Sequence, residues 1–205
     1  MSALVTGIGD TASVWTRLTD RVNALIWELP LPRRARVVLS EVVFRNPPMP
    51  PARVLEVVSA LQAAGLRAVM LGGWGIDALV GRQLRKHRDL DLVVEPRQFD
   101  RAVEVLQGLG FERWNADDAP VPFGPLKPER TATCRDGALR VVDLHGAELA
   151  ALEVTDGRVG NREVACLSAE QQLQTQIGRC WTPGRRRRRR GNLAALRTLL
   201  PSKAG

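Results

Sequence analysis

The hydrophobic positions of the chain change their period several times, from helical spacing to strand-like alternation and back. Apolar residues recur every three or four positions from about Thr11 to Leu29, which predicts an amphipathic helix that ends before "PLP". The next apolar patch, "ARVVLSEVVF", is compatible with a helix or a strand, and its charged residues favour a helix. "RNPPMPP" then interrupts the chain. We therefore expect residues 1–50 to form a helical N-terminal extension and residues 51–205 to form the main domain.

From residue 51 onward, segments of helical spacing alternate with short apolar runs. The predicted strands are "RAVML", "DLDLVV", "FERW", both arms of "ERTATCRDGALRVVDLHG" with a turn at Asp136-Gly137, and "REVACL". The predicted helices cover residues 51–64, 74–81, 96–106, about 168–179, and a last stretch that starts within or just after an arginine run and ends near Leu200. Ser168 and Gln171 have the spacing of a capping box. This order predicts an α/β (α+β) fold with C-terminal helices from about residue 168.

Two aspartates interrupt the apolar run "RDLDLVV", which otherwise has the composition of a buried strand. Because successive strand residues point to opposite faces, Asp89 and Asp91 share one face while Leu90 and Leu92 share the other. Two neighbouring carboxylates are costly to bury unless a cation neutralises them. Asp143 ends an apolar row on another predicted strand and could lie beside this pair. The three aspartates are therefore candidates for a catalytic metal site.

A glycine pair and a basic loop lie upstream of the two aspartates. Gly72 and Gly73 occur where a predicted strand gives way to a helix, an arrangement that offers backbone N–H groups and a positive helix end to a phosphate. The loop after this helix carries Arg85, Lys86 and Arg88. We interpret these five residues as candidate nucleotide-binding residues, which would share one cleft with the metal site.

Four other polar or aromatic residues near these segments have a structural interpretation that we favour. We expect Asp77 to complement the dipole of the helix at whose start it lies, and Trp74 to pack rather than to stack on a base. We expect His87 and His145, the two histidines of the chain, to be hydrogen-bonded structural residues.

Composition narrows the class of protein. A chain of 205 residues with 44% hydrophobic residues can fill one well-packed core. No apolar stretch reaches the roughly 18 residues that a membrane helix requires, and the N-terminus lacks the features of a secretory signal, so we expect a cytoplasmic protein without membrane contact. Its three cysteines have no CxxC spacing, which argues against a disulfide framework and against a zinc site.

The formal charge of +8 depends on one segment of the chain. The run from Arg185 to Arg190 contributes six positive charges, without which the net charge would be +2. The run has three interpretations, of which we favour the first: a solvated helical face, a contact with phosphate or RNA, and an ion-pair network with acidic residues. A non-catalytic nucleic-acid-binding module that uses this run is therefore an alternative function.

The segment "GGWGIDALVGRQLRKHRDLDLVV" and the later "VDLH" resemble the signature of the polymerase-β-type minimal nucleotidyltransferases. The closer resemblance is to the branch that modifies aminoglycosides and lincosamides, whose segment leading into the C-terminal helices is also similar to "VACLSAEQQL". The resemblance covers about residues 54–200. It implies the nucleotidyltransferase fold, a small mixed β-sheet flanked by helices.

The same resemblance implies roles for individual residues. Asp89 and Asp91 would hold Mg²⁺, as a two-ion site, on the triphosphate of an NTP, Gly73 would contact phosphate, and Asp143 would be a third metal ligand or the base. The implied reaction moves a nucleoside monophosphate to a hydroxyl of a small molecule, such as an aminoglycoside or lincosamide antibiotic, and releases pyrophosphate. The 3′ end of a tRNA, the acceptor of related toxin-type enzymes, is the alternative that the pI near 10.8 favours.

Overall fold

The computed structural model describes residues 47–113, 126–176 and 183–200, and four isolated positions before them. The helix predicted from about Thr11 to Leu29 lies almost wholly outside the described residues, and so does the patch "ARVVLSEVVF". The division of the chain after residue 50 stays a prediction. Met49 already belongs to the main core, where its side chain is fully buried.

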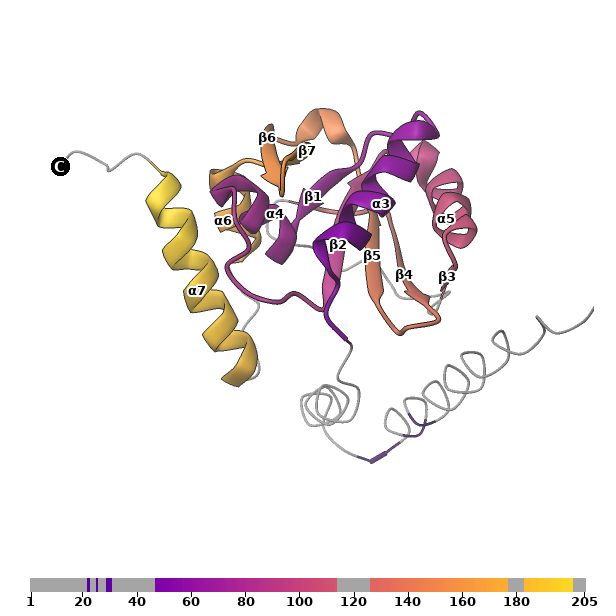
Figure 1. Ribbon diagram of the computed structural model, residues 1–205, viewed down its shortest axis with the longest axis horizontal. Helices are drawn as coiled ribbons and strands as arrows, with labels where there is room; N and C mark the ends of the chain where they lie inside the picture. Colours follow the sequence, from indigo (N-terminus) through magenta and orange to yellow (C-terminus); the bar gives the residue numbers. More distant parts are fainter. Residues whose placement is uncertain are drawn as a thin grey trace, which may run out of the picture.

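A seven-stranded mixed sheet forms the centre of the described part of the chain (Figure 1). Its strands are β1 (Val69–Leu71), β2 (Asp89–Val94), β3 (Phe111–Arg113), β4 (Arg130–Asp136), β5 (Val141–Gly146), β6 (Val154–Val159) and β7 (Arg162–Leu167). They lie in the order β3-β4-β5-β2-β1-β7-β6. Strand β2 pairs with β5, and β1 with β7, in parallel, whereas the other neighbours are antiparallel. The predicted mixed sheet is confirmed.

Helices flank this sheet, as predicted. They are α3 (Pro51–Ala63), α4 (Gly72–Val80), α5 (Phe99–Gly108), α6 (Ala169–Thr175) and α7 (Pro183–Leu199), with short 3-10 turns at Pro96–Gln98 and Leu149–Ala151. Figure 1 shows α3 and α5 together on one side of the sheet and α7 on the outer side of α4 and α6. None of the described helices is both long and apolar enough to cross a lipid bilayer.

Two predictions about helix ends need correction. Helix α7 begins at Pro183, before the arginine run rather than within or after it, because proline suits the first turn of a helix. At the start of α6, the Ser168 hydroxyl accepts a hydrogen bond from the Gln171 backbone N–H at 3.1 Å. The Gln171 side chain instead accepts from the backbone N–H of Glu153 at 2.9 Å. Only half of the predicted capping box is therefore present.

The two faces of the sheet differ in how they are covered. Leu90 and Leu92 of β2 belong to the large core cluster that also contains buried residues of α3 and α5. Val93 belongs to a smaller cluster on the opposite face, with Leu71 of β1 and Leu149 among its members. Strand alternation therefore places Asp89 and Asp91 on the face opposite the main core, as the sequence predicted.

Strands β4 and β5 form the predicted hairpin, but the turn is longer than expected. Four residues, 137–140, connect the strands, and Asp136 is the last residue of β4 rather than part of a two-residue turn. The Asp136 carboxylate accepts hydrogen bonds from the backbone N–H groups of Ala138 and Arg140, at 3.1 and 3.0 Å. Leu139 adopts a positive φ of 61°. The Asp136 side chain thus stabilises this four-residue turn by capping its backbone N–H groups.

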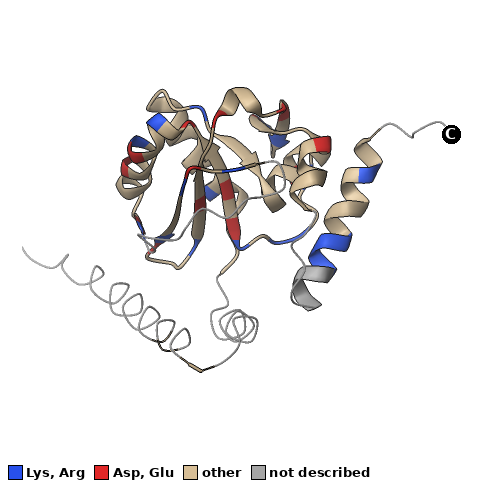
Figure 2. Ribbon diagram, turned by 180° about the vertical axis from the view of Figure 1, so that it is seen from behind, with Lys and Arg blue, Asp and Glu red and all other residues tan. Residues whose placement is uncertain are grey.

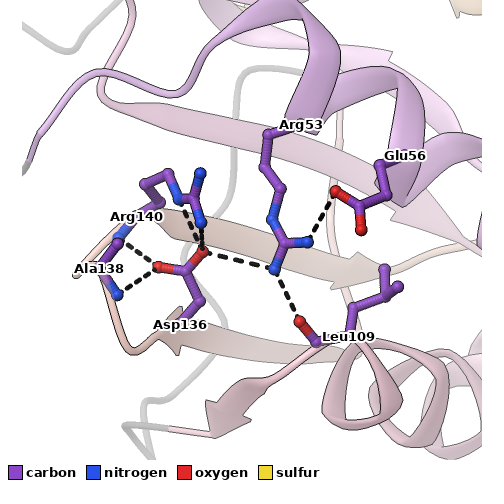
Figure 3. A network of polar contacts seen from close by, with 6 residues as sticks. All are labelled: Arg53, Glu56, Leu109, Asp136, Ala138 and Arg140. Atoms are coloured by element: carbon purple, nitrogen blue, oxygen red, sulfur yellow. Dashed lines mark hydrogen bonds and ion pairs between the residues drawn. The ribbon is translucent and has the colours of Figure 1, made fainter. Parts of the chain in front are cut away.

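The same carboxylate joins the hairpin to α3 (Figure 3). Asp136 Oδ2 lies 2.7 Å from the Arg140 guanidinium and 3.4 Å from Arg53 Nη2. Arg53 also contacts Glu56 at 2.7 Å, donates to the Leu109 carbonyl at 2.7 Å, and lies 4.5 Å from the centroid of the Phe111 ring. We call Arg53, Glu56, Asp136 and Arg140 the hairpin cluster. It connects α3, the end of α5 and the β4–β5 turn.

Candidate active site

Asp91 and Asp143 lie directly opposite each other on neighbouring parallel strands. In the β2–β5 register, Asp91 pairs with Asp143 and Asp89 pairs with Val141. Neighbouring strands run about 4.8 Å apart and paired residues share a face, so the two carboxylates stand side by side. Asp89 is exposed two positions earlier on the same face, whereas Asp91 and Asp143 are partly buried. The structure thus sets Asp91 opposite Asp143 and places Asp89 two positions away on the same face, and their predicted role as a metal site stays a prediction.

The environment of Asp143 disfavours its charged form. Burial raises the pKa of Asp143 to about 7, and the charges of Asp91 and Asp89 add to this rise. The Thr133 hydroxyl, which donates to Asp143 Oδ1 at 2.7 Å, opposes the rise in pKa, as does the nearby His145. The three carboxylates therefore repel one another in the protein alone, and a bound cation would relieve this repulsion.

His145 follows Asp143 by two positions and so shares its face of the sheet. Its ring is buried, and Nε2 lies 3.9 Å from Asp91 Oδ1. The histidine thus lies behind the carboxylates on the side of the smaller core cluster. Burial of the ring agrees with a packed side chain, whereas the hydrogen bond that the sequence predicted for His145 stays a prediction.

The two glycines allow the start of α4 to approach the carboxylates. Gly72 has a φ of +66°, and a Cβ atom there would lie 2.1 Å from Asp91 Oδ2. A Cβ atom on Gly73 would lie 2.1 Å from Nδ1 of His87. The Gly72 N–H donates to Gln172 Oε1 of α6 at 3.2 Å. Close packing therefore explains both glycines, and the role of Gly73 in phosphate binding stays a prediction.

Asp77 is structural, but not for the predicted reason. Because α4 begins at Gly72, Asp77 lies in its middle, where it is buried and cannot complement the dipole at the helix start. Asp77 Oδ2 lies 2.5 Å from Nε2 of the buried His87 and accepts from the Leu84 N–H at 3.1 Å. The Trp74 ring packs beside His87, with 5.2 Å between the ring centroids. These contacts hold the basic loop, residues 82–88, against α4.

Of the three basic residues predicted to bind nucleotide, Arg85 is the one that reaches the start of α4. Its Nη2 lies 3.1 Å from the position that a Cβ atom on Gly73 would occupy. Burial lowers the pKa of Arg85, the negative charge of Asp89 opposes this, and the positive charge of Arg188 of α7 lowers the pKa further. Neither the Lys86 ammonium nor the Arg88 guanidinium makes a hydrogen bond or ion pair with the residues that the structure describes. Their predicted nucleotide contacts stay untested.

Two side chains of this site were not found from the sequence. Thr133 of β4 pairs with Asp143 across the hairpin. This pairing could not be predicted from the sequence, because it depends on the register that the four-residue turn sets. Gln172 is fully buried in α6 and contacts Gly72. A buried glutamine in an amphipathic helix is a signal for such a contact, but the sequence does not show its partner.

Asp89, Asp91 and Asp143 are oxygen donors of the type that Mg²⁺ prefers, which makes the predicted metal site chemically possible only together with other ligands. Within residues 47–113, 126–176 and 183–200, no group of three or more His, Cys, Asp or Glu side chains is placed so that it could hold a metal ion by itself. Mg²⁺ generally keeps several waters and is held by one or two carboxylates plus phosphate oxygens rather than by an all-protein cage. Asp89, Asp91 and Asp143 supply such oxygen ligands on one face of the sheet.

Comparisons with known proteins agree with this geometry. Residues 53–190 match the family model described as aminoglycoside-2''-adenylyltransferase. Over 115 residues the chain is 24% identical to a lincosamide resistance protein of Staphylococcus haemolyticus, an alignment that covers 52% of this chain and 71% of that relative.

Two solved structures have a similar fold. One is the lincosamide antibiotic adenylyltransferase LnuA with lincomycin bound, with a TM-score of 0.61, 16% identity, and coverage of 75% of this chain and 100% of that chain. The other is ANT(2'')-Ia in complex with adenylyl-2''-tobramycin, with a TM-score of 0.59, 20% identity, and coverage of 75% and 90%. The predicted nucleotidyltransferase fold is thus confirmed. Because the family model spans well over half of its residues, the chain belongs to the aminoglycoside-2''-adenylyltransferase family of nucleotidyltransferase enzymes.

Proposed function

We propose that the protein is a Mg²⁺-dependent enzyme that transfers a nucleoside monophosphate from an NTP to a hydroxyl of a small molecule of the aminoglycoside or lincosamide class. The observation that carries the proposal is the register that sets Asp91 beside Asp143, next to the glycine start of α4. Membership of the adenylyltransferase family supports the same reaction.

Each part of the site has a role in this reaction. Asp89 and Asp91 would hold the metal, which when bound neutralises triphosphate oxygens and polarises the α-phosphoryl group. The acceptor oxygen forms a bond to the α-phosphorus while the bond from that phosphorus to the bridging oxygen of the β-phosphate breaks. Pyrophosphate leaves, and the proton of the acceptor hydroxyl goes to Asp143.

Asp143 is suited to accept that proton. Before a cation binds, burial and the charges of Asp91 and Asp89 raise the pKa of Asp143 to about 7, which makes this carboxylate a stronger proton acceptor than an ordinary aspartate. The Thr133 hydroxyl holds Oδ1 by a 2.7 Å hydrogen bond and so orients the carboxyl group. Thr133 is therefore a positioning residue for the base.

The acceptor is the part of the proposal that most needs an experiment. The named antibiotics of the relative and of the two solved structures favour a small hydroxylated molecule. The arginine run keeps the 3′ end of a tRNA as the alternative, because phosphate backbones bind clustered arginines. Incubation with each labelled NTP and Mg²⁺, together with a panel of aminoglycosides and lincosamides or with total RNA, separates the two. If label appeared in RNA alone, the acceptor would be RNA rather than a small molecule.

The test of the chemistry compares two Asp→Asn changes. Asp91→Asn removes a metal ligand and should abolish transfer, whereas Asp156→Asn changes an exposed aspartate of the distant edge strand β6 and should leave transfer unchanged. Chelation of divalent ions with EDTA should stop the parent enzyme as completely as Asp91→Asn does. Undiminished transfer by the Asp91→Asn protein would refute the proposed mechanism.

A further inference from the structure

The C-terminal helices α6 and α7 both pack against α4, the helix that begins at the candidate active site. Figure 2 shows the basic residues of α7 at the outer edge of the molecule, whereas the acidic residues of the central strands lie further in. Arg187 and Arg190 are exposed but Arg188 and Arg189 are partly buried, so the favoured interpretation of the whole run as a solvated face is wrong for the latter two. The first residue of α4 is contacted by α6, through the side chain of Gln172.

Gln172 places a polar side chain where a helix generally buries an apolar one. The residue is fully buried, and a buried amide costs free energy unless it is hydrogen-bonded. Its Oε1 accepts a hydrogen bond from the Gly72 N–H at 3.2 Å. Its Nε2 has no hydrogen-bond partner among the residues that the structure describes. Packing alone therefore does not explain a glutamine here, because an apolar side chain of similar size would fill the space without this cost.

Helix α4 makes room for the amide of Gln172. A Cβ atom on Gly75 would lie 2.2 Å from Gln172 Nε2 and 2.9 Å from the Met70 carbonyl oxygen. Gly75 is inside α4, and glycine within a helix costs roughly 0.5–1 kcal/mol relative to alanine. A glycine and a buried glutamine, each unfavourable by itself, are thus fitted to each other at this contact.

The hydrogen bond from Gly72 to Gln172 lies directly beside the Asp91 carboxylate. Leu71 pairs with Asp91 in the β1–β2 register, and a Cβ atom on the next residue, Gly72, would lie 2.1 Å from Asp91 Oδ2. The carboxylate therefore packs against the backbone of Gly72. The first N–H groups of a helix have no acceptor within the helix, and Gln172 supplies one for Gly72. Because the peptide group is planar, holding this N–H also fixes the backbone on which Asp91 rests.

We propose that Gln172 is a positioning residue of the reaction, which holds the start of α4 so that the Asp91 carboxylate keeps its productive orientation. The inference rests on the proposed function and gives α6 a part in it. Gln172 acts through Gly72 and itself touches neither the nucleotide nor the acceptor.

The neighbouring Gln171 provides a matched control. It lies on the same helix, is 7% exposed, and its Oε1 accepts a hydrogen bond from the backbone N–H of Glu153 at 2.9 Å. Gln172→Met and Gln171→Met each remove one side-chain acceptor of one backbone N–H while keeping a side chain of similar length. Both variants should therefore show comparable decreases in the midpoint of urea unfolding.

The kinetic test compares the two variants at a temperature where both are folded. In Gln172→Met, kcat should fall about 10- to 100-fold, because a small displacement of a group in the reacting constellation has an effect of this size. The KM values for NTP and acceptor should change much less. Gln171→Met should keep the kcat and KM of the parent.

A second measurement follows the site without turnover. Nuclear magnetic resonance of each protein, with EDTA present, gives the hydrogen-exchange rate of the Gly72 amide and the ¹³C signal of the Asp91 carboxyl group. Gln172→Met should speed exchange at Gly72 and shift the Asp91 signal. Gln171→Met should change neither.

Two results would overturn the inference. One is an equal kcat of Gln172→Met and Gln171→Met, and the other is an Asp91 carboxyl signal that Gln172→Met leaves unchanged. If the parent transfers no nucleotide, the proposed function fails, whereas the Asp91 signal still decides whether Gln172 holds that carboxylate in place.

Discussion

Asp136 and Asp143 belong to the same hairpin, yet their surroundings are opposite. Asp136 ends β4 on the α3 side of the sheet, where it is surrounded by donors: two backbone N–H groups and the guanidinium groups of Arg140 and Arg53. Asp143 lies in β5 on the other face, where its nearest charged neighbours include Asp91 and Asp89. One carboxylate is buried with partners, and the other is partly buried among like charges.

This difference separates a structural charge from a candidate catalytic one. A buried carboxylate with a full set of donors connects the helices and strands that carry those donors. Its removal leaves the neighbouring cations without that partner. Carboxylates that repel one another reduce stability, and such arrangements are concentrated at functional sites, where a ligand compensates them. Four predictions test the contrast, beginning with the largest effect.

Replacing Asp143 by Asn should reduce kcat by about 10²–10⁴-fold, the usual contribution of a general base. The fold should persist, because the change also removes one of three mutually repelling charges. Initial rates with saturating NTP and acceptor measure the loss, and thermal unfolding checks the fold. If turnover stays at the parent level, Asp143 is not the base.

Replacing Asp136 by Ala should have the reverse profile. Its removal leaves Arg53 and Arg140 without their shared partner, so the free energy of unfolding should fall by about 3–5 kcal/mol. Urea unfolding measures this change, and kcat at a temperature where the variant is folded should match the parent. Asp100→Ala, which removes the exposed ion pair with Arg130, is the control and should leave the urea midpoint unchanged. Comparable losses in both variants would contradict the assigned role of the hairpin cluster.

Gly72→Ala and Gly81→Ala distinguish backbone strain from damage to the site. Both glycines have positive φ, +66° and +76°, so alanine at either should cost about 1–2 kcal/mol of stability. At Gly81 nothing lies within 4 Å of the added Cβ, whereas at Gly72 it would meet Asp91 Oδ2. Turnover should therefore drop only in Gly72→Ala. Equal activity of the two proteins would show that Asp91 moves aside without consequence.

The smallest effect is a pH dependence of stability in the presence of EDTA. The folded-state pKa of Asp143, about 7, lies above its ordinary value of 3.8, so the folded protein binds the proton more tightly than the unfolded chain. This contribution to stability is present at low pH and is lost as pH rises toward 7, with a slope of at most about 1.4 kcal/mol per pH unit. Unfolding midpoints of the parent and of Asp143→Asn, measured from pH 5 to 8, should depend on pH with different slopes if Asp143 makes this contribution. Parallel curves would exclude this coupling.

Much of the active-site prediction was local and could be made from the sequence. Strand alternation in "DLDLVV" places Asp89 and Asp91 on one face whatever the rest of the fold does. The prediction for Asp77 failed because it depended on where α4 begins. The helix was predicted to start at residue 74, but it starts at Gly72, directly after β1. With this earlier start, Asp77 lies too far from the first turn of α4 to interact with the helix dipole.

The sequence by itself determined the family and the order of the helices and strands apart from β6, which no pattern predicted, because these depend on short-range spacing and on motifs contained in continuous segments. Tertiary structure alone decided which residues meet across those segments. Asp143 lies beside Asp91 because β5 pairs with β2 in parallel, and Gly72 contacts Gln172 because α4 packs against α6. Such contacts depend on strand register and helix packing over long sequence separations, and no local pattern contains that information.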